Sequence, residues 1–241
     1  MIDIYVLKGI DEVKRNLSQN DITIVIDVIR CGSTIIAGLQ NGGKRFIPVT
    51  SIKDVREAVK RNPRYISAGE RGGAKVEWFD LGNSPTEMVP DTVSGRTIVM
   101  TTSNGTPLIR LGMDMSKTLL IGALINYKAC AAKAEKLARK EKTDIKILIP
   151  QTHQGECIED LYAAGLIVKH LGSKKFTPQW DSTKIAMLLA ETPQQRIMEE
   201  LRDSQSAKRV AELGYKDDIA YSLQMNTSSL VPISKNSSIA I

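Results

Sequence analysis

The sequence predicts an α/β fold with three layers, α/β/α, a mainly parallel or mixed sheet and a helix-rich C-terminal extension. Over residues 1–150, short apolar runs alternate with segments whose apolar residues recur at helical spacing. Runs such as 22–26 and 145–149 are nearly continuous in β-branched residues, which is typical of strands buried on both faces. We therefore expect one α/β domain, 1–241, in which 151–241 pack on the sheet. A separate helical subdomain is the alternative.

The expected elements follow one another in a regular order. The strands before residue 151 are 2–7, 23–27, 45–49, 65–68, 97–100, 118–122 and 145–150. The helices between them are 33–41, capped by Ser33 or Thr34, 51–61, begun by Ser51, 106–111 and 127–142. The later helices are 158–170, 183–190, 192–203, 204–213 and 217–225. Residues 230–234 would form an edge-like strand, because Pro232 has no amide hydrogen for a sheet ladder.

The composition is that of an ordinary globular protein. Hydrophobic residues make up 42% and charged residues 25%, which argues against a disordered or fibrous chain. The longest apolar runs are too short to span a bilayer, so we expect no membrane partner. Residues 1–7 have neither a basic segment nor a long apolar one and are expected to form a strand, not a signal peptide. The expected location is the cytoplasm.

Cysteine and histidine are both sparse. Cys31, Cys130 and Cys157 show no CxxC spacing, which argues against a disulfide framework or a zinc site. Two histidines, His153 and His170, are too few for a histidine metal cage or a Ser-His-Asp triad, and we expect both to be structural.

The chain is basic, with a net charge of +6, and much of the excess lies in the expected helix 127–142. Acidic residues are interleaved there, which indicates a solvated helix face. Nucleic-acid binding would favour aromatic side chains for stacking within a basic stripe, but aromatic residues are only 5% of the chain. We therefore expect no nucleic-acid partner.

Four polar motifs stand at or just after the ends of expected strands. They are 27–34 (DVIRCGST), 69–73 (GERGG), 79–85 (FDLGNSP) and 101–106 (TTSNGT). The second and third lie in a long polar connection, 69–95, and connections of that length are often functional. Ligands of open α/β sheets bind beyond the carboxyl ends of the strands, so we expect Asp27, Glu70 and Thr101 to converge.

The chemistry of these motifs combines two kinds of group. Carboxylates can hold a hard cation, whereas arginines and backbone amides at glycine-rich turns can hold an anion. Arg30, for example, can clamp a phosphate or carboxylate with two nitrogens, and 101–106 can form an anion nest at a helix start. The combination predicts a divalent-metal site for a phosphorylated small molecule.

Each of these residues also has a purely structural interpretation. Asp27 could cap a helix, and Arg30 could form an ion pair with Asp27. The motifs 79–85 and 101–106 could be turns, and Asn126 could be an N-cap. The acidic pair Glu159 and Asp160 opens a helix, where acids favour the helix dipole, but it could also complete a metal site.

Taken together, the motifs resemble the 2-phosphosulfolactate phosphatase family of coenzyme M biosynthesis. The matching pieces are the four motifs, followed in the same order by 122–126 and by Glu159-Asp160 with Ala164-Gly165 behind them. Segments 217–220 and 231–232 are similar too. Cys31-Gly32 departs from the alanine and small polar residue usual there, and Ser103 replaces a threonine, but neither change removes a charge.

The resemblance implies a magnesium-dependent phosphatase that hydrolyses 2-phospho-3-sulfolactate to 3-sulfolactate and phosphate, on a three-layer α/β/α fold. On this hypothesis the ligands of Mg²⁺ would be drawn from Asp27, Glu70, Asp80 and Glu159. The catalytic residues would be Asp27, Arg30, Glu70, Arg71 and Asp160. The substrate-binding residues would be Arg30, Arg71, Asn83, Ser84, Thr102, Ser103, Asn104, Gly105 and Asn126.

Several alternatives are left open at this point. The attacking group is either water or a carboxylate that is first phosphorylated. The substrate is a small anionic phosphorylated molecule, and another phosphorylated hydroxy acid is the alternative to phosphosulfolactate. A non-catalytic anion-binding protein on the same fold is a different class of function. A homodimer is also left open.

Overall fold

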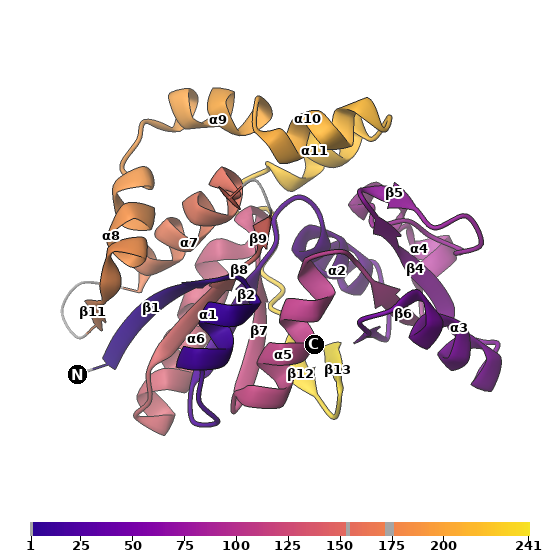
Figure 1. Ribbon diagram of the computed structural model, residues 1–241, viewed down its shortest axis with the longest axis horizontal. Helices are drawn as coiled ribbons and strands as arrows, with labels where there is room; N and C mark the ends of the chain where they lie inside the picture. Colours follow the sequence, from indigo (N-terminus) through magenta and orange to yellow (C-terminus); the bar gives the residue numbers. More distant parts are fainter. Residues whose placement is uncertain (1, 153–154, 172–175) are drawn as a thin grey trace.

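The computed structural model describes residues 2–152, 155–171 and 176–241 and consists of a central sheet with helices on both faces (Figure 1). The α/β fold expected from the sequence is confirmed. His153, expected to be structural, lies outside the described residues. Among the helices of the described segments, none combines the length and the apolar character needed to cross a membrane.

The sheet is mixed and is built from two parallel blocks. Its strands are β1 (Ile2–Lys8), β2 (Ile22–Ile26), β3 (Arg45–Pro48), β4 (Ile66–Arg71), β5 (Ala74–Lys75), β6 (Thr97–Thr101), β7 (Thr118–Gly122), β8 (Ile145–Ile149), β11 (Phe176–Pro178), β12 (Ile233–Lys235) and β13 (Ser238–Ala240). Their order across the sheet is β11-β1-β8-β2-β7-β12-β13-β3-β6-β4-β5. A separate hairpin joins β9 (Gln151–Thr152) and β10 (Gly155–Glu156).

The C-terminal strand differs from the expectation for 230–234. We expected an edge strand, but β12 and β13 form a hairpin inside the sheet, antiparallel to β7 on one side and to β3 on the other. Pro232 contributes to this pairing through its carbonyl group, which accepts a hydrogen bond from the Ile121 amide at 3.0 Å. The missing amide hydrogen of proline is therefore no obstacle at this position. The end of the chain thus joins the two parallel blocks.

The helices form the outer layers. They are α1 (Gly9–Asn16), α2 (Cys31–Gln40), α3 (Ile52–Arg61), α4 (Pro90–Val93), α5 (Gly105–Met115), α6 (Tyr127–Glu141), α7 (Ile158–His170), α8 (Trp180–Leu189), α9 (Gln194–Arg202), α10 (Gln205–Glu212) and α11 (Lys216–Ser222), with 3-10 turns at Pro85–Glu87 and Leu124–Asn126. Helices α6, α7 and α8 cover one face of the sheet, and α1, α2 and α5 cover the other.

The core follows directly from alternation along the strands. In β8, Ile145, Ile147 and Ile149 face the layer of α6 and α7, whereas Leu148 faces the opposite layer. Because both sets are apolar, the strand reads as a nearly continuous apolar run in the sequence, interrupted by Lys146. The expected burial of these strands on both faces is therefore confirmed.

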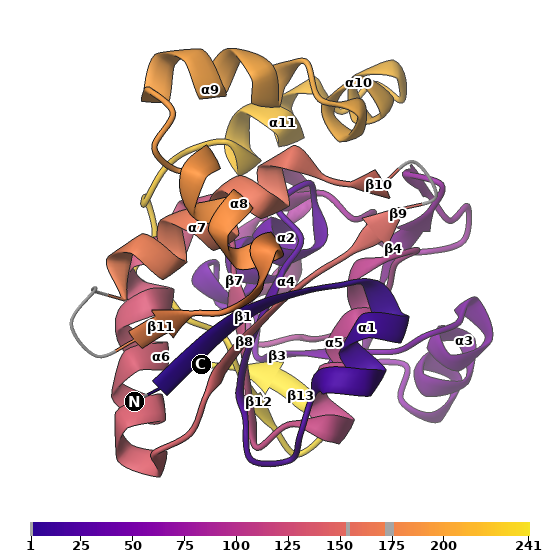
Figure 2. The ribbon, with the colours of Figure 1, turned by 60° about the vertical axis from the view of Figure 1, so that its left-hand side comes forward.

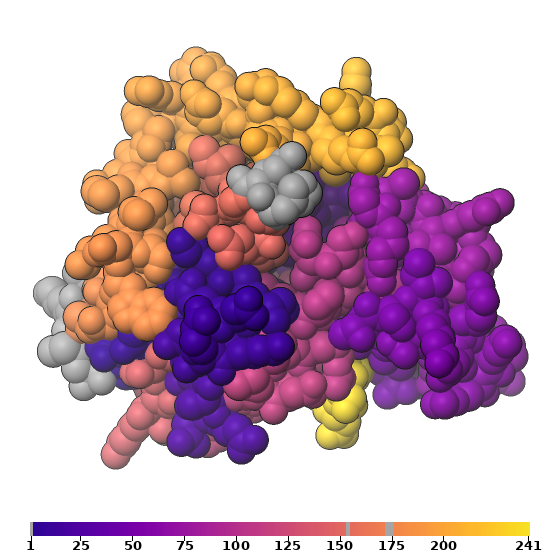
Figure 3. Space-filling model, viewed as in Figure 1, coloured from indigo at the N-terminus to yellow at the C-terminus, as the bar shows by residue number. Residues whose placement is uncertain are grey.

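Helices α9, α10 and α11 do not belong to either layer. They lie across the edge of the sheet, above the loops that follow β2 and β4 (Figures 1 and 2). The space-filling view shows a recess between these helices and the segments beneath them (Figure 3). The C-terminal extension thus covers the edge at which we expected the polar motifs to converge.

The starts of α3 and α2 show where the local sequence predicted a helix cap correctly and where it did not. Ser51 begins α3 as expected: its hydroxyl accepts the Asp54 amide, and the Asp54 carboxylate accepts the Ser51 amide, both at 3.1 Å. The prediction that Ser33 or Thr34 would cap α2 was wrong. Helix α2 begins earlier, at Cys31, and these two hydroxyls donate to backbone carbonyls of the preceding turn, at 2.8 and 3.0 Å.

Candidate active site

A cleft of about 1010 Å³ opens between the carboxyl ends of the strands and the C-terminal helices. Its inner end is lined by Asp27, Arg30, Glu70 and Glu159, and its outer wall includes residues of α10. Asn83, Ser103 and Asn104 also line it. The expected convergence of Asp27 and Glu70 is confirmed, whereas Thr101 does not line the cleft.

Asp27 lies directly after β2, in the turn that leads into α2. One oxygen, Oδ1, accepts a hydrogen bond from the Cys31 amide at 3.0 Å, and the Asp27 carbonyl accepts from Gly32 at 2.7 Å. The other oxygen, Oδ2, lies against Gly105 at the start of α5, where an added Cβ would collide with Oδ2 and with Cys31. Only glycine at position 105 allows the helix to begin so close to this carboxylate.

Glu70 lies near the end of β4 and ties two loops together. Its Oε1 accepts the Ser103 amide at 2.6 Å, and its Oε2 accepts the Gly73 amide at 2.7 Å and the Ser103 hydroxyl at 3.1 Å. The neighbouring Gly69 has φ of 134°, and a side chain there would collide with the Thr101 carbonyl. Glu70 is thus held rigidly at the inner end of the cleft.

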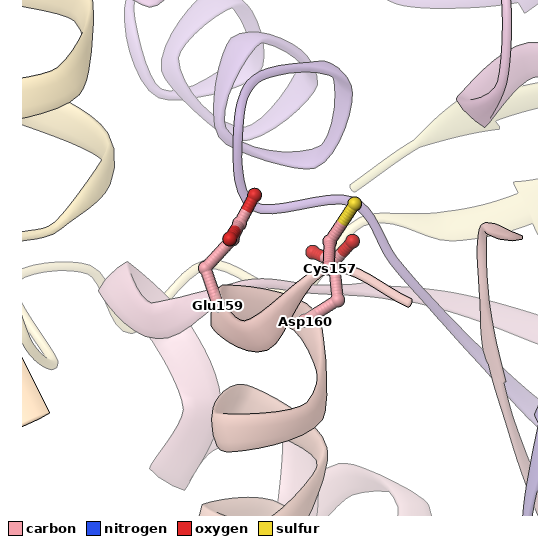
Figure 4. Close-up of side chains that lie close together, drawn as sticks. All are labelled: Cys157, Glu159 and Asp160. Carbon is pink, nitrogen blue, oxygen red and sulfur yellow. The ribbon is translucent and has the colours of Figure 1, made fainter. Parts of the chain in front are cut away.

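Glu159, Asp160 and Cys157 lie together at the start of α7 and point toward the loop that follows β2 (Figure 4). Asp160 Oδ1 accepts the Val28 amide at 2.7 Å, which fixes that loop. Glu159 is only 1% exposed, and neither of its carboxylate oxygens has a hydrogen-bond partner among the described residues. A buried carboxylate without partners is costly, and in proteins it commonly marks a cation site or a reactive group.

The carboxylates at the inner end interact with one another. Burial, together with the charges of Glu70 and Glu159, raises the pKa of Asp27 from 3.8 to about 7. Burial also raises the pKa of Glu159, although the nearby hydroxyls of Ser206 and Ser204 oppose the rise. Burial and the Glu159 charge raise the pKa of Asp160 well above its usual range. This concentration of negative charge calls for a positive counter-charge.

Arg30 does not supply that counter-charge by pairing with Asp27, as the structural interpretation had it. Its Nη1 donates to Asp218 Oδ2 at 2.8 Å and its Nη2 to the Gly73 carbonyl at 2.5 Å. The guanidinium carbon lies 4.5 Å from the centre of the Tyr215 ring. The Arg30 side chain is 2% exposed, and two of its donor nitrogens are already engaged inside the protein.

Asp218 completes this buried ion pair from α11. Its second oxygen, Oδ1, accepts the hydroxyls of Ser84 and Thr86 at 2.6 and 2.7 Å. The motif 27–34, the loop 79–85 and the C-terminal helices therefore meet at one carboxylate. In the sequence, no pattern singles out Asp218 within segment 217–220.

Other residues chosen from the sequence support the cleft without lining it. Asp80 is exposed and accepts the amide and hydroxyl of Ser67 at 2.8 and 2.7 Å. Arg71 donates to the Glu70 carbonyl and to the Thr101 hydroxyl, at 2.7 and 2.8 Å. Neither lines the cleft in the structure.

Asn126 and Thr102 are likewise structural in their contacts. Asn126 is fully buried, accepts the Ala123 amide and donates to the carbonyls of Ile121 and Leu230, which joins the end of β7 to the C-terminal segment. The Thr102 hydroxyl accepts the Thr106 amide at 2.9 Å in the first turn of α5. His170, at the end of α7, makes an edge contact with the Tyr127 ring.

Sequence reasoning missed the residues of the outer wall. Ser204, Ser206, Lys208 and Arg209 line the cleft from α10 and its N-cap, and the Arg209 guanidinium donates to the Gly72 carbonyl at 3.2 to 3.3 Å. An amphipathic helix of this kind has no signal that distinguishes cleft-lining residues from solvated ones.

The donor set fits a hard divalent cation. Glu159 offers two unpartnered oxygens, and Asp27 Oδ2 accepts no hydrogen bond from any described residue. Glu70, whose oxygens are engaged by loop donors, stands beside them. Carboxylate oxygens are the ligands that Mg²⁺ and Ca²⁺ take in proteins. Asp80 does not line the cleft, and its carboxylate is bonded to Ser67, so it is not part of this donor set.

An α/β fold with acidic residues and a helix start at the carboxyl ends of its strands is an arrangement that suits phosphoryl-group hydrolysis. The comparisons with known proteins agree. Residues 9–237 match the model of the 2-phosphosulpholactate phosphatase family. The chain belongs to this family, so the expected family is confirmed, and so is its class as a phosphoric monoester hydrolase.

Curated relatives carry the same family name. The chain is 36% identical over 236 residues to a probable 2-phosphosulfolactate phosphatase of Clostridium tetani, and the match covers 98% of each chain. It is 33% identical over 224 residues to a protein of the same name from Clostridium acetobutylicum, covering 92% of this chain and 93% of the relative. The relative from Deinococcus radiodurans is 34% identical over 213 residues, covering 88% and 87%.

The buried ion pair yields a prediction for stability. Asp218→Ala should lower the free energy of unfolding by about 3–5 kcal/mol, because it leaves the Arg30 charge buried without a partner. Asp217→Ala, at the exposed neighbouring position, is the matched control and should change it by less than about 0.5 kcal/mol. Urea unfolding followed by circular dichroism measures both. Equal losses in the two variants would contradict the role of the pair.

The carboxylate cluster yields a prediction for pH dependence. Because folding raises the pKa of Asp27, its contribution to stability is present below its unfolded value of 3.8 and is lost as the pH rises through about 7. In EDTA, Asp27→Asn should therefore stabilise the protein at pH 8, by on the order of 3 kcal/mol, and much less at pH 5. Thermal unfolding at the two pH values measures this, with exposed Asp91→Asn as control. A loss of stability at both pH values would contradict it.

Proposed function

We propose that this protein is a magnesium-dependent phosphatase that hydrolyses 2-phospho-3-sulfolactate to 3-sulfolactate and phosphate. The names of the curated relatives and the family match support the substrate. The observation that carries the metal dependence is the buried, unpartnered Glu159 carboxylate beside Asp27. The expected location in the cytoplasm and the homodimer stay predictions from the sequence.

The charges of the cleft support a cation requirement. Among the residues that the structure describes, seven carboxylate side chains and three cationic ones line it. The acidic residues are Asp27, Glu70, Glu156, Glu159, Glu200, Asp203 and Glu212, and the basic ones are Arg30, Lys208 and Arg209. A substrate that carries phosphate, sulfonate and carboxylate groups would be repelled by such a cleft. A divalent cation taken from solution removes this repulsion.

Asp27 and Glu159 would hold Mg²⁺ directly, with Glu70 as a third ligand or as the holder of a metal-bound water. When bound, the ion would neutralise charge on the phosphate oxygens. Asp160 would not need to touch the metal, because its hydrogen bond to the Val28 amide already fixes the turn that carries Asp27. Asp160 is therefore a positioning residue in this proposal.

The anionic substrate would lie between two walls of the cleft. On the inner wall, α5 begins at Gly105 beside Asp27, and a helix N-terminus favours a phosphate group. Asn104, its N-cap, lines the cleft and makes no side-chain capping bond. On the outer wall, Lys208 and Arg209 supply the cations for the sulfonate and carboxylate ends.

Arg30 takes a different role from the phosphate clamp expected from the sequence. With Nη1 on Asp218 and Nη2 on the Gly73 carbonyl, it fixes the loop after β4 and the C-terminal helices around the cleft. Arg71 likewise acts through the backbone of Glu70 and the Thr101 hydroxyl. We therefore assign both arginines as positioning residues, and their substrate contacts stay predictions from the sequence.

Phosphate release tests the activity itself. Racemic 2-phospho-3-sulfolactate, phospholactate and phosphoglycolate would be compared with and without Mg²⁺, and we expect release that needs the metal and favours the sulfonated compound. Glu159→Gln should lower kcat/KM on the order of 10²-fold or more, because a ligand of the cation that neutralises the phosphate charge is lost. Glu156→Gln, at the exposed mouth of the cleft, is the control and should change it little.

The outcomes of this assay separate the alternatives. Metal-dependent release without preference for the sulfonate would favour a phosphatase for another phosphorylated hydroxy acid. Binding of these anions with no release, in the presence of Mg²⁺, would favour the non-catalytic anion-binding protein. Full activity of Glu159→Gln would contradict the metal assignment.

Arg209 yields a prediction for specificity. Arg209→Gln should raise KM for the sulfonated substrate about tenfold or more and leave kcat and the KM for phospholactate nearly unchanged, because a charge-assisted hydrogen bond to the sulfonate is lost. Steady-state kinetics on both substrates measures this. Arg202→Gln, on α9 and outside the cleft lining, is the matched control. An equal rise in KM for both substrates would exclude a role in sulfonate recognition.

A further inference from the structure

Cys157 has no part in the proposed reaction, yet its thiol lies at the inner end of the cleft. It is the N-cap residue of α7, it is only partly buried, and it lines the cleft together with Glu159. Its sulfur accepts a hydrogen bond from the Ser206 hydroxyl at 3.5 Å, from the opposite wall. The thiol can therefore be reached by a small ion that enters the cleft.

The thiol belongs to a cluster with the geometry of a metal site. The sulfur of Cys157 and one carboxylate oxygen each of Glu159 and Asp160 all lie within 4.8 Å of one another (Figure 4). In a tetrahedral site with bonds of about 2.3 Å to sulfur and 2.1 Å to oxygen, these donors would be about 3.6 Å apart. Metal binding therefore requires these donor atoms to approach one another by up to about 1.2 Å.

Glu159 supplies an independent sign that a cation belongs there. Its carboxylate is 99% buried, and both of its oxygens lack hydrogen-bond partners among the residues that the structure describes. It stands beside the other two donors in the first turn of α7. The nearby Ser206 and Ser204 hydroxyls oppose the rise in its pKa but do not outweigh burial, so a bound cation would stabilise this charge.

We propose that Cys157, Glu159 and Asp160 bind a thiophilic divalent cation such as Zn²⁺, at a site that shares Glu159 with the proposed magnesium site. The sulfur gives up its proton to the buffer as the sulfur–metal bond forms. Thiolate ligands favour Zn²⁺ and Cd²⁺ over Mg²⁺, which prefers oxygen donors. The two kinds of ion therefore compete for Glu159, and each excludes the other.

Cadmium is the direct probe of the site, because a cadmium–thiolate bond gives an ultraviolet charge-transfer band. We expect the wild-type protein to show this band with one equivalent of Cd²⁺, and Cys157→Ser to lose it. Serine is a favoured N-cap residue, so the variant should keep its fold, which thermal unfolding checks. Cys130→Ala is the matched control, since Cys130 is buried in the core, and it should keep the band. Persistence of the band in Cys157→Ser would overturn the proposal.

Zinc affinity tests the carboxylate ligand. In competition with a chromophoric chelator, Cys157→Ser and Glu159→Gln should each weaken Zn²⁺ binding at least tenfold, and Glu156→Gln should not. Added Mg²⁺ should weaken Zn²⁺ binding to the wild type. Unchanged zinc affinity in Cys157→Ser, or zinc binding that is indifferent to Mg²⁺, would overturn the shared site.

Inhibition of phosphate release by Zn²⁺ is the functional consequence, and this part rests on the proposed function. The zinc concentration for half-inhibition, measured for each variant against its own uninhibited rate, should be at least tenfold higher in Cys157→Ser than in wild type. An inactive protein that still shows the Cd²⁺ band would contradict the proposed phosphatase and leave the thiolate site in place. A protein that releases phosphate but shows no Cd²⁺ band would support the proposed phosphatase and overturn the thiolate site.

Discussion

The buried ion pair between Arg30 and Asp218 is the interaction on which the cleft depends. Arg30 is the N-cap residue of α2, whereas Asp218 lies in α11, so the pair joins segments 188 positions apart. Arg30 also binds the Gly73 carbonyl, and Asp218 also binds the hydroxyls of Ser84 and Thr86. Because a buried charge must be paired, the loops and the C-terminal helices have one stable arrangement around the cleft.

The carboxylates at the inner end of the cleft, in contrast, are buried without a cationic partner among the residues that the structure describes. Asp27, Glu159 and Asp160 all have pKa values raised chiefly by burial. The protein thus stores unfavourable electrostatic energy at the point where a cation and a phosphate would neutralise each other. A site of this kind trades stability for function, because the same charges that bind a metal ion weaken the fold without one. The cluster that contains Cys157 shares this charge, which explains how a second kind of cation could use it.

The residues of the polar motifs divide into two groups that look alike in the sequence. Asp27, Glu70, Asn104 and Glu159 line the cleft, whereas Asp80, Arg71 and Asn126 bond to backbone and hydroxyl groups that shape it. Both groups stand at strand ends in polar turns, where functional and structural side chains have the same composition. The direction of the side chain decides whether a residue lines the cleft or only shapes it. A shift of one or two residues in a loop changes that direction.

The sequence by itself determined the α/β alternation, the family and the edge of the sheet at which the motifs meet, because apolar periodicity and strand-end positions are local properties. The tertiary structure alone decided what surrounds that edge. It placed the β12–β13 hairpin inside the sheet, brought Asp218 to Arg30 and put Lys208 and Arg209 opposite Asp27. These contacts join residues far apart in the chain, and they form because buried charges and unpaired strand edges must find partners, which no local pattern specifies.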